Sequence, residues 1–189
     1  MKQLGDKQLI VLCRKGDERA FGELYGRYRL QLYSYLNRLL PRQEHLVDDM
    51  FQQTWIKVFD GLDKYVDDRK FISWLYRIAH NLVVDHIRRE VRRPTVELDE
   101  RLPAETEPVW KNMDKAAVSG ALERAIETLS LEQREVVMLR RRGVAFKDIA
   151  GIQNSTLNTV LGRMHYAVKH LRRWFESWED EVKLPAGAE

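Results

Sequence analysis

The chain of 189 residues contains one cysteine and no long apolar run. With Cys13 as its one thiol, a disulfide within the chain is excluded, and the apolar residues around it favour an ordinary buried thiol. No apolar stretch approaches the roughly 20 residues that a membrane-spanning helix needs. The N-terminal segment also lacks the small-residue cleavage pattern of a secretory signal. We therefore expect a cytoplasmic protein without membrane insertion.

Signs of catalysis are equally scarce. The five histidines form neither an HExxH motif nor another metal-ligand cluster, and the sequence has no glycine loop for phosphate. Asp48 and Asp49 are adjacent, and adjacent side chains on a helix point in different directions, which excludes a ready pair of catalytic carboxylates. These absences predict a protein that is not an enzyme and that uses no cofactor and no metal.

Strand patterns are missing as well, whereas apolar residues recur at helical spacing along most of the chain. This pattern predicts an all-α fold. Ser130 followed by Gln133 indicates a capping box at the start of one helix, and Gly143 is suited to follow its end. The expected helices cover residues 6–15, 17–40, 44–60, 71–90, 116–129, 130–142, 145–152 and 156–178.

A proline-rich, acidic segment separates the helices into two groups. Its few apolar residues cannot bury enough surface to form a core. We expect a first small helical domain at residues 1–92, a flexible linker at 93–113, a second domain at 114–180 and a tail at 181–189.

Charge is segregated along the chain, although the formal net charge is only +3. Residues 134–173 contain many cations and only two acidic residues, Glu135 and Asp148. Such clustering favours a surface that faces phosphate. The cations of this segment are Arg134, Arg140, Arg141, Arg142, Lys147, Arg163, Lys169, Arg172 and Arg173.

Residues 144–166 have the layout of a helix-turn-helix. A short helix and a turn of small residues precede a longer helix with a polar N-terminal end, which in this motif enters the major groove of DNA. The alternative is the solvated face of an ordinary three-helix unit. The polar residues expected at DNA are Ser155, Thr156, Asn158 and Thr159, with Arg163, Lys169, Arg172 and Arg173 on the backbone. The apolar stripe of the longer helix is Leu157, Val160, Leu161, Met164, Val168, Leu171 and Phe175.

The helix expected at residues 71–90 has two different sides. The core arc consists of Leu75, Ile78, Ala79, Leu82 and Val83. The opposite side and the preceding loop combine aromatic rings with cations, a combination that suits unpaired bases and works only where strands are open. For Trp74, a place in the core is an equal alternative. The mixed set consists of Tyr65, Arg69, Lys70, Phe71, Trp74, Arg77, Asn81 and Arg88.

Three stretches together resemble the extracytoplasmic-function (ECF) sigma factors, the small specificity subunits of bacterial RNA polymerase. They are VDDMFQQTWIKVF at 47–59, WLYRIAHNLVVDHIRRE at 74–90 and LSLEQREVVMLRRRGVAFKDIA at 129–150. The second is similar to the family's W-L-x-R-I-A-x-N-x-x-x-D-x-x-R-R pattern, which is a specific signature. The resemblance covers nearly the whole chain.

The resemblance implies a partner or a DNA element for each part of the chain. The first domain would bind the clamp coiled coil of the polymerase β′ subunit through Asp48, Asp49, Gln52 and Lys57. The loop from Tyr65 to Phe71, with Trp74, Arg77 and Asn81, would melt and hold the non-template strand of the minus-ten element. Arg88 and Arg89 would meet backbone phosphate.

For the rest of the chain, the resemblance implies that the second domain reads the minus-thirty-five element as duplex DNA and touches the β flap. We expect the acidic linker to occupy the positive nucleic-acid channel of the polymerase. The family also implies an anti-sigma factor as a further partner.

The sequence departs from the family at the recognition helix. The family's T-V-K-S-R is TVLGR here, with Leu161 and Gly162, and Tyr166 stands where an arginine is common. Arg163 is retained, while Lys147 replaces a usual acidic residue. These departures change the groups expected to face DNA, so Tyr166 is kept among them.

Two other functions remain open from the residues alone. A helix-turn-helix transcriptional regulator would need a dimer interface or a ligand pocket, and the sequence identifies neither. A sigma mimic that does not support initiation would not need Arg77, Asn81, Arg88 and Arg163.

Overall fold

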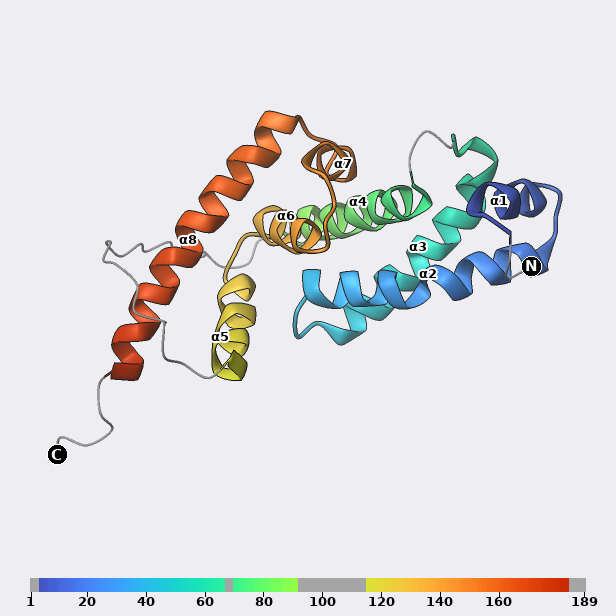
Figure 1. Cartoon of the computed structure of the whole chain (residues 1–189). Helices are drawn as coiled ribbons and strands as arrows, with labels where there is room; N and C mark the ends of the chain where they lie inside the picture. The colour runs from blue at the N-terminus through green and yellow to red at the C-terminus, as the bar shows by residue number, and fades with distance from the viewer. Residues whose placement is uncertain (1–3, 67–69, 92–114, 184–189) are drawn as a thin grey trace. The chain divides into compact units, whose positions relative to one another are not determined.

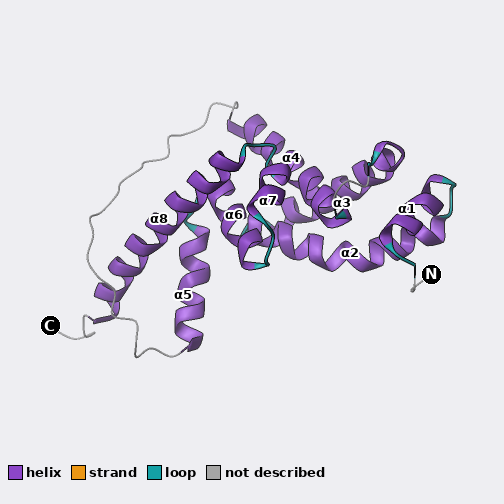
Figure 2. Cartoon of the chain, turned by 45° about the horizontal axis from the view of Figure 1, so that its top comes forward, coloured by secondary structure: helices purple, strands orange, loops and turns teal. Residues whose placement is uncertain are grey.

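The computed structural model describes residues 4–66, 70–91 and 115–183. Its regular secondary structure in these ranges is helical throughout (Figure 2), which confirms the all-α fold. None of the described helices is both long and apolar enough to cross a membrane. In chain order (Figure 1) the elements are α1 Asp6–Arg14, α2 Glu18–Leu39, α3 Glu44–Gly61, the 3-10 helix η1 Leu62–Lys64, α4 Phe71–Val91, α5 Lys115–Glu127, α6 Leu131–Arg141, α7 Phe146–Ile152 and α8 Leu157–Lys183.

The chain divides into two compact units. One contains residues 1–95 and 147–156, and the other contains residues 96–146 and 157–189. This division groups α7 with the first unit. The expected linker at 93–113 lies entirely outside the described residues, and the domain limits of 1–92 and 114–180 stay a prediction.

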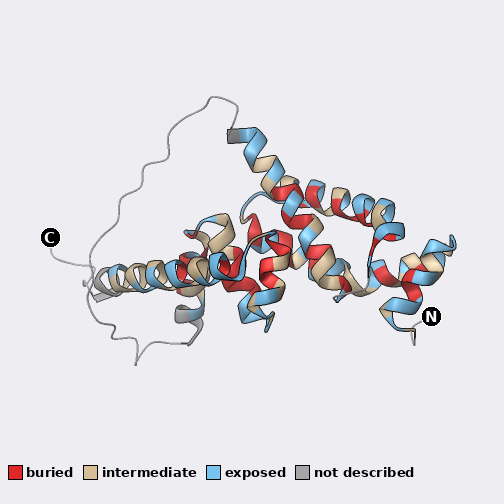
Figure 3. Ribbon diagram, turned by 90° about the horizontal axis from the view of Figure 1, so that it is seen from above, coloured by how far each residue is buried: buried red, intermediate tan, exposed pale blue. Residues whose placement is uncertain are grey.

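The first unit is built around α2, which packs against α1, α3 and α4. Asp17 starts α2 because its carboxylate accepts hydrogen bonds from the backbone N–H groups of Arg19 and Ala20, at 2.9 and 3.2 Å. Leucines and aromatic rings fill the core, and Tyr35 stacks on Tyr76 with ring centroids 4.4 Å apart. Figure 3 shows buried residues recurring along the sides of the helices that face one another.

The second unit consists of α5, α6 and α8, and its core is mainly aliphatic. Ser130 caps α6 as expected, since its hydroxyl accepts from the backbone N–H of Gln133 at 3.4 Å. Gly143 follows α6 with a φ of 79°, a conformation that side chains disfavour. The buried cluster is Ile126, Leu129, Val137, Met138 and Ala167.

Arg134 supports this unit from within. Its Nε donates to the carbonyl of Ile126 at 3.2 Å, and its Nη2 donates to those of Glu127 and Leu129 at 2.6 and 3.1 Å. Burial lowers the pKa of the guanidinium, against the opposing effect of the Glu127 carboxylate. The expectation that Arg134 contributes to a phosphate-facing surface is therefore wrong, because its donors hold the C-terminal end of α5.

Cys13 is only partly buried on α1. Burial raises the pKa of its thiol, and the charge of the Asp17 carboxylate adds to the effect. Both effects favour the protonated thiol over the reactive thiolate, in keeping with an ordinary structural cysteine.

Candidate nucleic-acid interface

Helix α4 has the two sides that its sequence predicts. Leu75, Ala79, Leu82 and Val83 are buried, while Ile78 is partly exposed. The polar side is exposed, so its cations and amide are available to a partner rather than packed in the core. Its exposed residues are Lys70, Arg77, Asn81, Arg88 and Arg89, whereas Arg69 lies outside the described residues.

Three aromatic rings lie together at the N-terminal end of this side. The centroids of Tyr65 and Trp74 are 4.6 Å apart, those of Phe71 and Trp74 are 5.6 Å apart, and those of Tyr65 and Phe71 are 5.9 Å apart. We call Tyr65, Phe71 and Trp74 the aromatic cluster. Each ring contacts the other two, so the cluster joins the end of η1 to the start of α4.

Two members of the aromatic cluster are buried, although the sequence predicted a surface position for them. Tyr65 is 5% exposed and Phe71 is 2% exposed, so neither ring offers a face to a DNA base in this structure. The expectation of a surface position was wrong, because apolar rings on both sides of a loop bury one another when the loop brings its ends together. Whether either residue contacts DNA stays a prediction.

The sequence left two alternatives for Trp74, a place in the core or a surface position that stacks on bases, and the structure shows an intermediate position. It is partly exposed, although its ring contacts both Tyr65 and Phe71. Gly61 leaves room for the indole, since a Cβ there would lie 3.3 Å from Trp74 Cζ2. Lys70, four residues before Trp74, and Arg77, three residues after it, are both exposed.

At the other end of α4, Arg88 and Arg89 are exposed, and the Arg89 Nε donates to the Asp85 carbonyl at 3.1 Å. Cations near the C-terminal end of a helix also interact favourably with its dipole. This contact occupies one donor of Arg89 and leaves the rest of its guanidinium available for phosphate oxygens.

Helix α3 presents a second polar surface, on which Asp48, Asp49, Gln52 and Lys57 are all exposed. Asp48 accepts a hydrogen bond from the Tyr33 hydroxyl at 3.0 Å, and this bond raises the pKa of the Tyr33 phenol. Asp49 accepts from Gln53 Nε2 at 3.0 and 2.9 Å. The two carboxylates are thus oriented by neighbours on α2 and α3.

Sequence reasoning missed two apolar residues on this surface. Ile56 is 61% exposed and Phe59 is 65% exposed. At 100° per residue, both lie within about 60° of Gln52 around the helix axis, so the three share one face. Their spacing of four and seven residues from Gln52 is the signal in the sequence that places them on this face. Exposed apolar side chains beside polar ones are typical of protein-binding surfaces.

The start of α8 has the polar residues expected of a recognition helix. The Ser155 N–H donates to the Ala150 carbonyl at 2.9 Å, and Asn154 has a positive φ of 46° in the turn after α7. Thr156, Asn158 and Thr159 are exposed, Ser155 and Arg163 are partly buried, and Tyr166 is 63% exposed.

Two leucines of the expected apolar stripe of α8 are on the surface. Leu157 is 46% exposed and Leu161 is 43% exposed, whereas Val160 is buried. In the first turns of α8 the expected stripe is therefore buried only at Val160. A Cβ at Gly162 would meet nothing within 4 Å, so packing against another helix does not require this glycine.

Among the described residues, no group of histidine, cysteine, aspartate or glutamate is arranged to hold a metal ion. The exposed groups are instead cations, amides, hydroxyls and a few apolar side chains. They are suited to binding macromolecules through hydrogen bonds, phosphate contacts and ring stacking.

Comparison with known proteins gives the family. Residues 24–93 match the family model for sigma-70 region 2. The ECF RNA polymerase sigma-E factor of Salmonella typhimurium (strain 14028s / SGSC 2262) is 30% identical over 177 residues, which cover 88% of this chain and 92% of the relative. That of Escherichia coli (strain K12) matches over the same shares of both chains, also with 30% identity. The chain belongs to the ECF sigma factors. As a sigma factor it is a transcription initiation factor rather than an enzyme.

Solved structures share the fold of this sigma factor. The sigma factor RpoE from Bartonella quintana, in complex with the anti-sigma factor NepR, has a TM-score of 0.62 at 20% identity, over 82% of this chain and 96% of that one. CnrH, in complex with the cytosolic domain of CnrY, has a TM-score of 0.60 at 23% identity, over 93% and 97%.

Proposed function

We propose that this sigma factor binds core RNA polymerase and directs initiation at specific promoters, reading the minus-ten element as an open strand and the minus-thirty-five element as duplex. The exposed side of α4 supports the proposal most directly. It places Trp74, Arg77 and Asn81 on one surface, with the apolar residues of α4 on the other side of the helix. An indole and a cation next to an amide can stack on, neutralise and hydrogen-bond an unpaired nucleotide.

The polar surface of α3 is our candidate for the polymerase, where it would meet the clamp coiled coil of the β′ subunit. Asp48, Asp49, Gln52 and Lys57 supply charge and hydrogen bonds, and Ile56 and Phe59 add apolar area. Apolar side chains surrounded by a polar rim are the usual anatomy of such an interface. Contact of the second domain with the β flap belongs to the same proposal.

The N-terminal turns of α8 are our candidate for duplex DNA. Asn158 and Thr159 are exposed there, and Arg163 lies one turn further along the helix. Leu157 and Leu161 suit the methyl groups of thymine in the major groove, since these are the apolar atoms that a base pair presents there. We therefore expect Leu161, which departs from the family pattern, to contribute to the promoter preference.

An anti-sigma factor is the proposed regulator, because the structural neighbours RpoE and CnrH were each solved with a partner chain bound, NepR being described as an anti-sigma factor. The alternative functions remain a regulator that acts without polymerase and a mimic that does not initiate.

Reconstitution separates these functions. The full chain is mixed with sigma-free core polymerase and a library of random DNA in which each template carries a transcribed barcode, and promoter-dependent transcripts are sequenced. A sigma factor yields transcripts from templates that share two DNA elements upstream of the start site. A regulator would bind DNA by itself without transcripts, and a mimic would bind an anti-sigma factor without supporting initiation; either result would refute the proposal.

Asn81→Ala tests the assignment of α4, with Asn37→Ala on α2 as a matched control, because both asparagines are exposed. Asn81→Ala should reduce transcripts by about tenfold with core binding unchanged, since a base-reading hydrogen bond contributes about 1–3 kcal/mol. Equal activity of the two variants would remove Asn81 from the proposed interface.

A further inference from the structure

Helix α1 reaches the aromatic cluster through Arg14. The Arg14 Nε donates to the carbonyl of Leu62 at 3.0 Å, and its Nη2 donates to the carbonyl of Tyr65. One guanidinium thus holds both ends of the short turn that leads into the cluster. Its planar fork suits two backbone acceptors in a way that an ammonium group does not.

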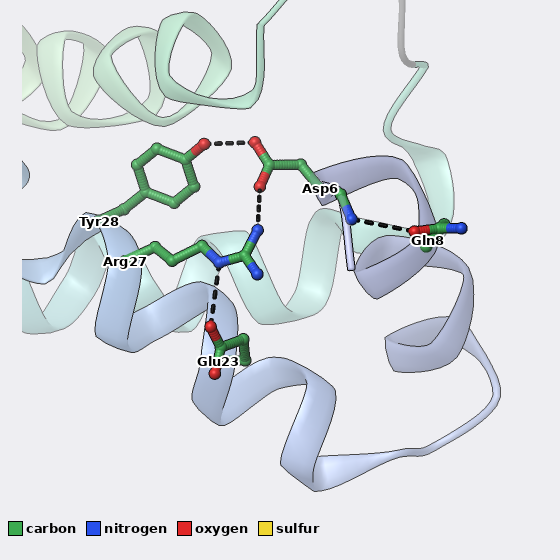
Figure 4. A network of polar contacts seen from close by, with 6 residues as sticks. Asp6, Gln8, Glu23, Arg27 and Tyr28 are labelled. Carbon is green, nitrogen blue, oxygen red and sulfur yellow. Dashed lines mark hydrogen bonds and ion pairs between the residues drawn. The ribbon is translucent and has the colours of Figure 1, made fainter. Parts of the chain in front are cut away.

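A second contact leads from α1 to the other side of the aromatic cluster. Asp6 accepts hydrogen bonds from the Tyr28 hydroxyl and, at 3.1 Å, from Arg27 Nη1, while Arg27 Nε donates to Glu23 at 3.1 Å (Figure 4). The Tyr28 ring lies against Phe71, with centroids 5.2 Å apart. The Asp6 carboxylate therefore orients the ring on which Phe71 rests.

These two contacts meet at the same rings. Arg14 fixes the backbone of Tyr65, Asp6 fixes the ring that packs on Phe71, and both Tyr65 and Phe71 contact Trp74. Arg14 and Asp6 lie at opposite ends of α1, so the whole helix acts as a brace across the cluster.

Helix α1 precedes residues 24–93, which match sigma-70 region 2. Its side chains are also absent from the surfaces that we assign to DNA and polymerase. A packing helix needs only apolar contacts, which Leu9 and Ile10 already provide by being buried. The hydrogen bonds from Arg14 to backbone carbonyls and from Tyr28 to Asp6 go beyond that need, and they converge on one place.

We infer that α1 positions Trp74 and the adjacent cationic side of α4 for the open promoter strand, with Arg14 and Asp6 as positioning residues. The inference rests on the proposed function. An indole that must stack on a base has to be held at a fixed angle, and small displacements of a binding group remove much of its contribution. The hydrogen bonds from α1 add to the ring packing, because they fix the Tyr65 backbone and the Tyr28 ring.

Arg14→Ala tests this inference, with Lys15→Ala as the matched control. Both variants remove one exposed cation from the C-terminal end of α1, but only Arg14 bonds to the Leu62 and Tyr65 carbonyls. Holoenzyme is assembled from core polymerase and each full-length variant, on a promoter selected by the wild-type holoenzyme. Permanganate reactivity of unpaired thymines then reports the open complex.

We expect Arg14→Ala to lower the yield of open complex by about tenfold, the ratio that corresponds to about 1.4 kcal/mol. Core binding should stay unchanged, and Lys15→Ala should match the wild type. On a template opened beforehand by mismatches, thymines react without holoenzyme, so transcript yield is measured instead. There the defect should shrink to about twofold, since strand capture no longer has to supply the cost of melting. Equal losses on both templates would indicate general misfolding and would overturn the inference, as would wild-type melting by Arg14→Ala.

Two further measurements keep the test decisive. Tyr28→Phe removes only the hydroxyl that bonds to Asp6 and keeps the ring on Phe71; it should give a smaller melting defect of about threefold, which decides the matter if Arg14→Ala does not fold. Amide hydrogen exchange of the free full-length chain should show faster exchange at residues 62–66 and 70–74 in Arg14→Ala and not in Lys15→Ala. Unchanged exchange would overturn the inference, even if the wild type supported no transcription and the proposed function had failed.

Discussion

The two units use their aromatic rings differently. In the first unit nearly all ring contacts join separate elements, as Phe21 with Trp55 joins α2 to α3 and Tyr35 with Tyr76 joins α2 to α4. In α8 the rings contact neighbours on the same helix, as Trp174 does with Trp178 at 6.1 Å. Rings thus set the relative positions of helices in the first unit, whereas aliphatic side chains perform this role in the second. Ring packing of this kind would suit the proposed role of the first unit in holding an open strand, whereas the role proposed for α8, insertion into a groove, needs less of it.

Removal of one ring from each unit should give the largest difference in stability. Tyr35→Ala should lower the free energy of unfolding by about 3–5 kcal/mol, since it removes a fully buried ring that joins two helices. Trp178→Ala, at a partly exposed ring, should cost about 1 kcal/mol or less. Urea unfolding followed by circular dichroism measures both, and similar losses would contradict the distinction between the units.

The stability of the second unit should instead depend on the hydrogen bonds of one partly buried cation, Arg134. Arg134→Ala removes three hydrogen bonds to carbonyls at the end of α5 and should cost about 2 kcal/mol. Arg172→Ala, which removes an exposed cation from α8, is the control and should leave the unfolding midpoint in place. If both variants unfold at the same urea concentration as the wild type, Arg134 does not support the unit.

The affinity of the second unit for DNA should depend on the charge of Arg163. Arg163→Ala should weaken binding of the holoenzyme to its promoter and reduce the slope of log affinity against log salt by about one, as expected for one lost phosphate contact. Arg38→Ala on α2 is a control that removes the same charge from the first unit. A slope that stays at the wild-type value would show that Arg163 does not bind phosphate.

The smallest expected effect concerns thymine methyl groups. Replacing thymine by deoxyuridine in the minus-thirty-five element should weaken wild-type binding by about fourfold per contacted methyl, because each buried methyl group contributes about 0.8 kcal/mol. The Leu161→Ala variant should respond less to the same replacement. If it responds as the wild type does, Leu161 does not contact a thymine methyl group.

Local patterns predicted the helices well, because periodicity and capping are properties of neighbouring residues. The expected limits of most helices agree with the structure to within about two residues, while α8 continues to Lys183 rather than ending at residue 178. The polar side of α4 was also predicted, since Arg77 and Asn81 follow from helical phase alone.

Contacts between segments far apart in the chain could not be predicted from local patterns. Tyr65 and Phe71 looked like surface rings because the sequence does not show that the ends of their loop meet. Arg134 looked like a phosphate ligand because nothing local indicates that it turns back to α5. Arg14 was overlooked for the same reason, since its acceptors lie 48 and 51 residues further along the chain.

The position of α1 has a practical consequence for work with fragments. A fragment that begins at residue 24, where the match to sigma-70 region 2 starts, would retain every side chain proposed to touch the separated strand. It would lack both Asp6 and Arg14. Weak binding of DNA by this fragment would follow from the loss of α1, which supports the aromatic cluster. Substitutions of the proposed contact residues should therefore be tested in a protein that contains α1.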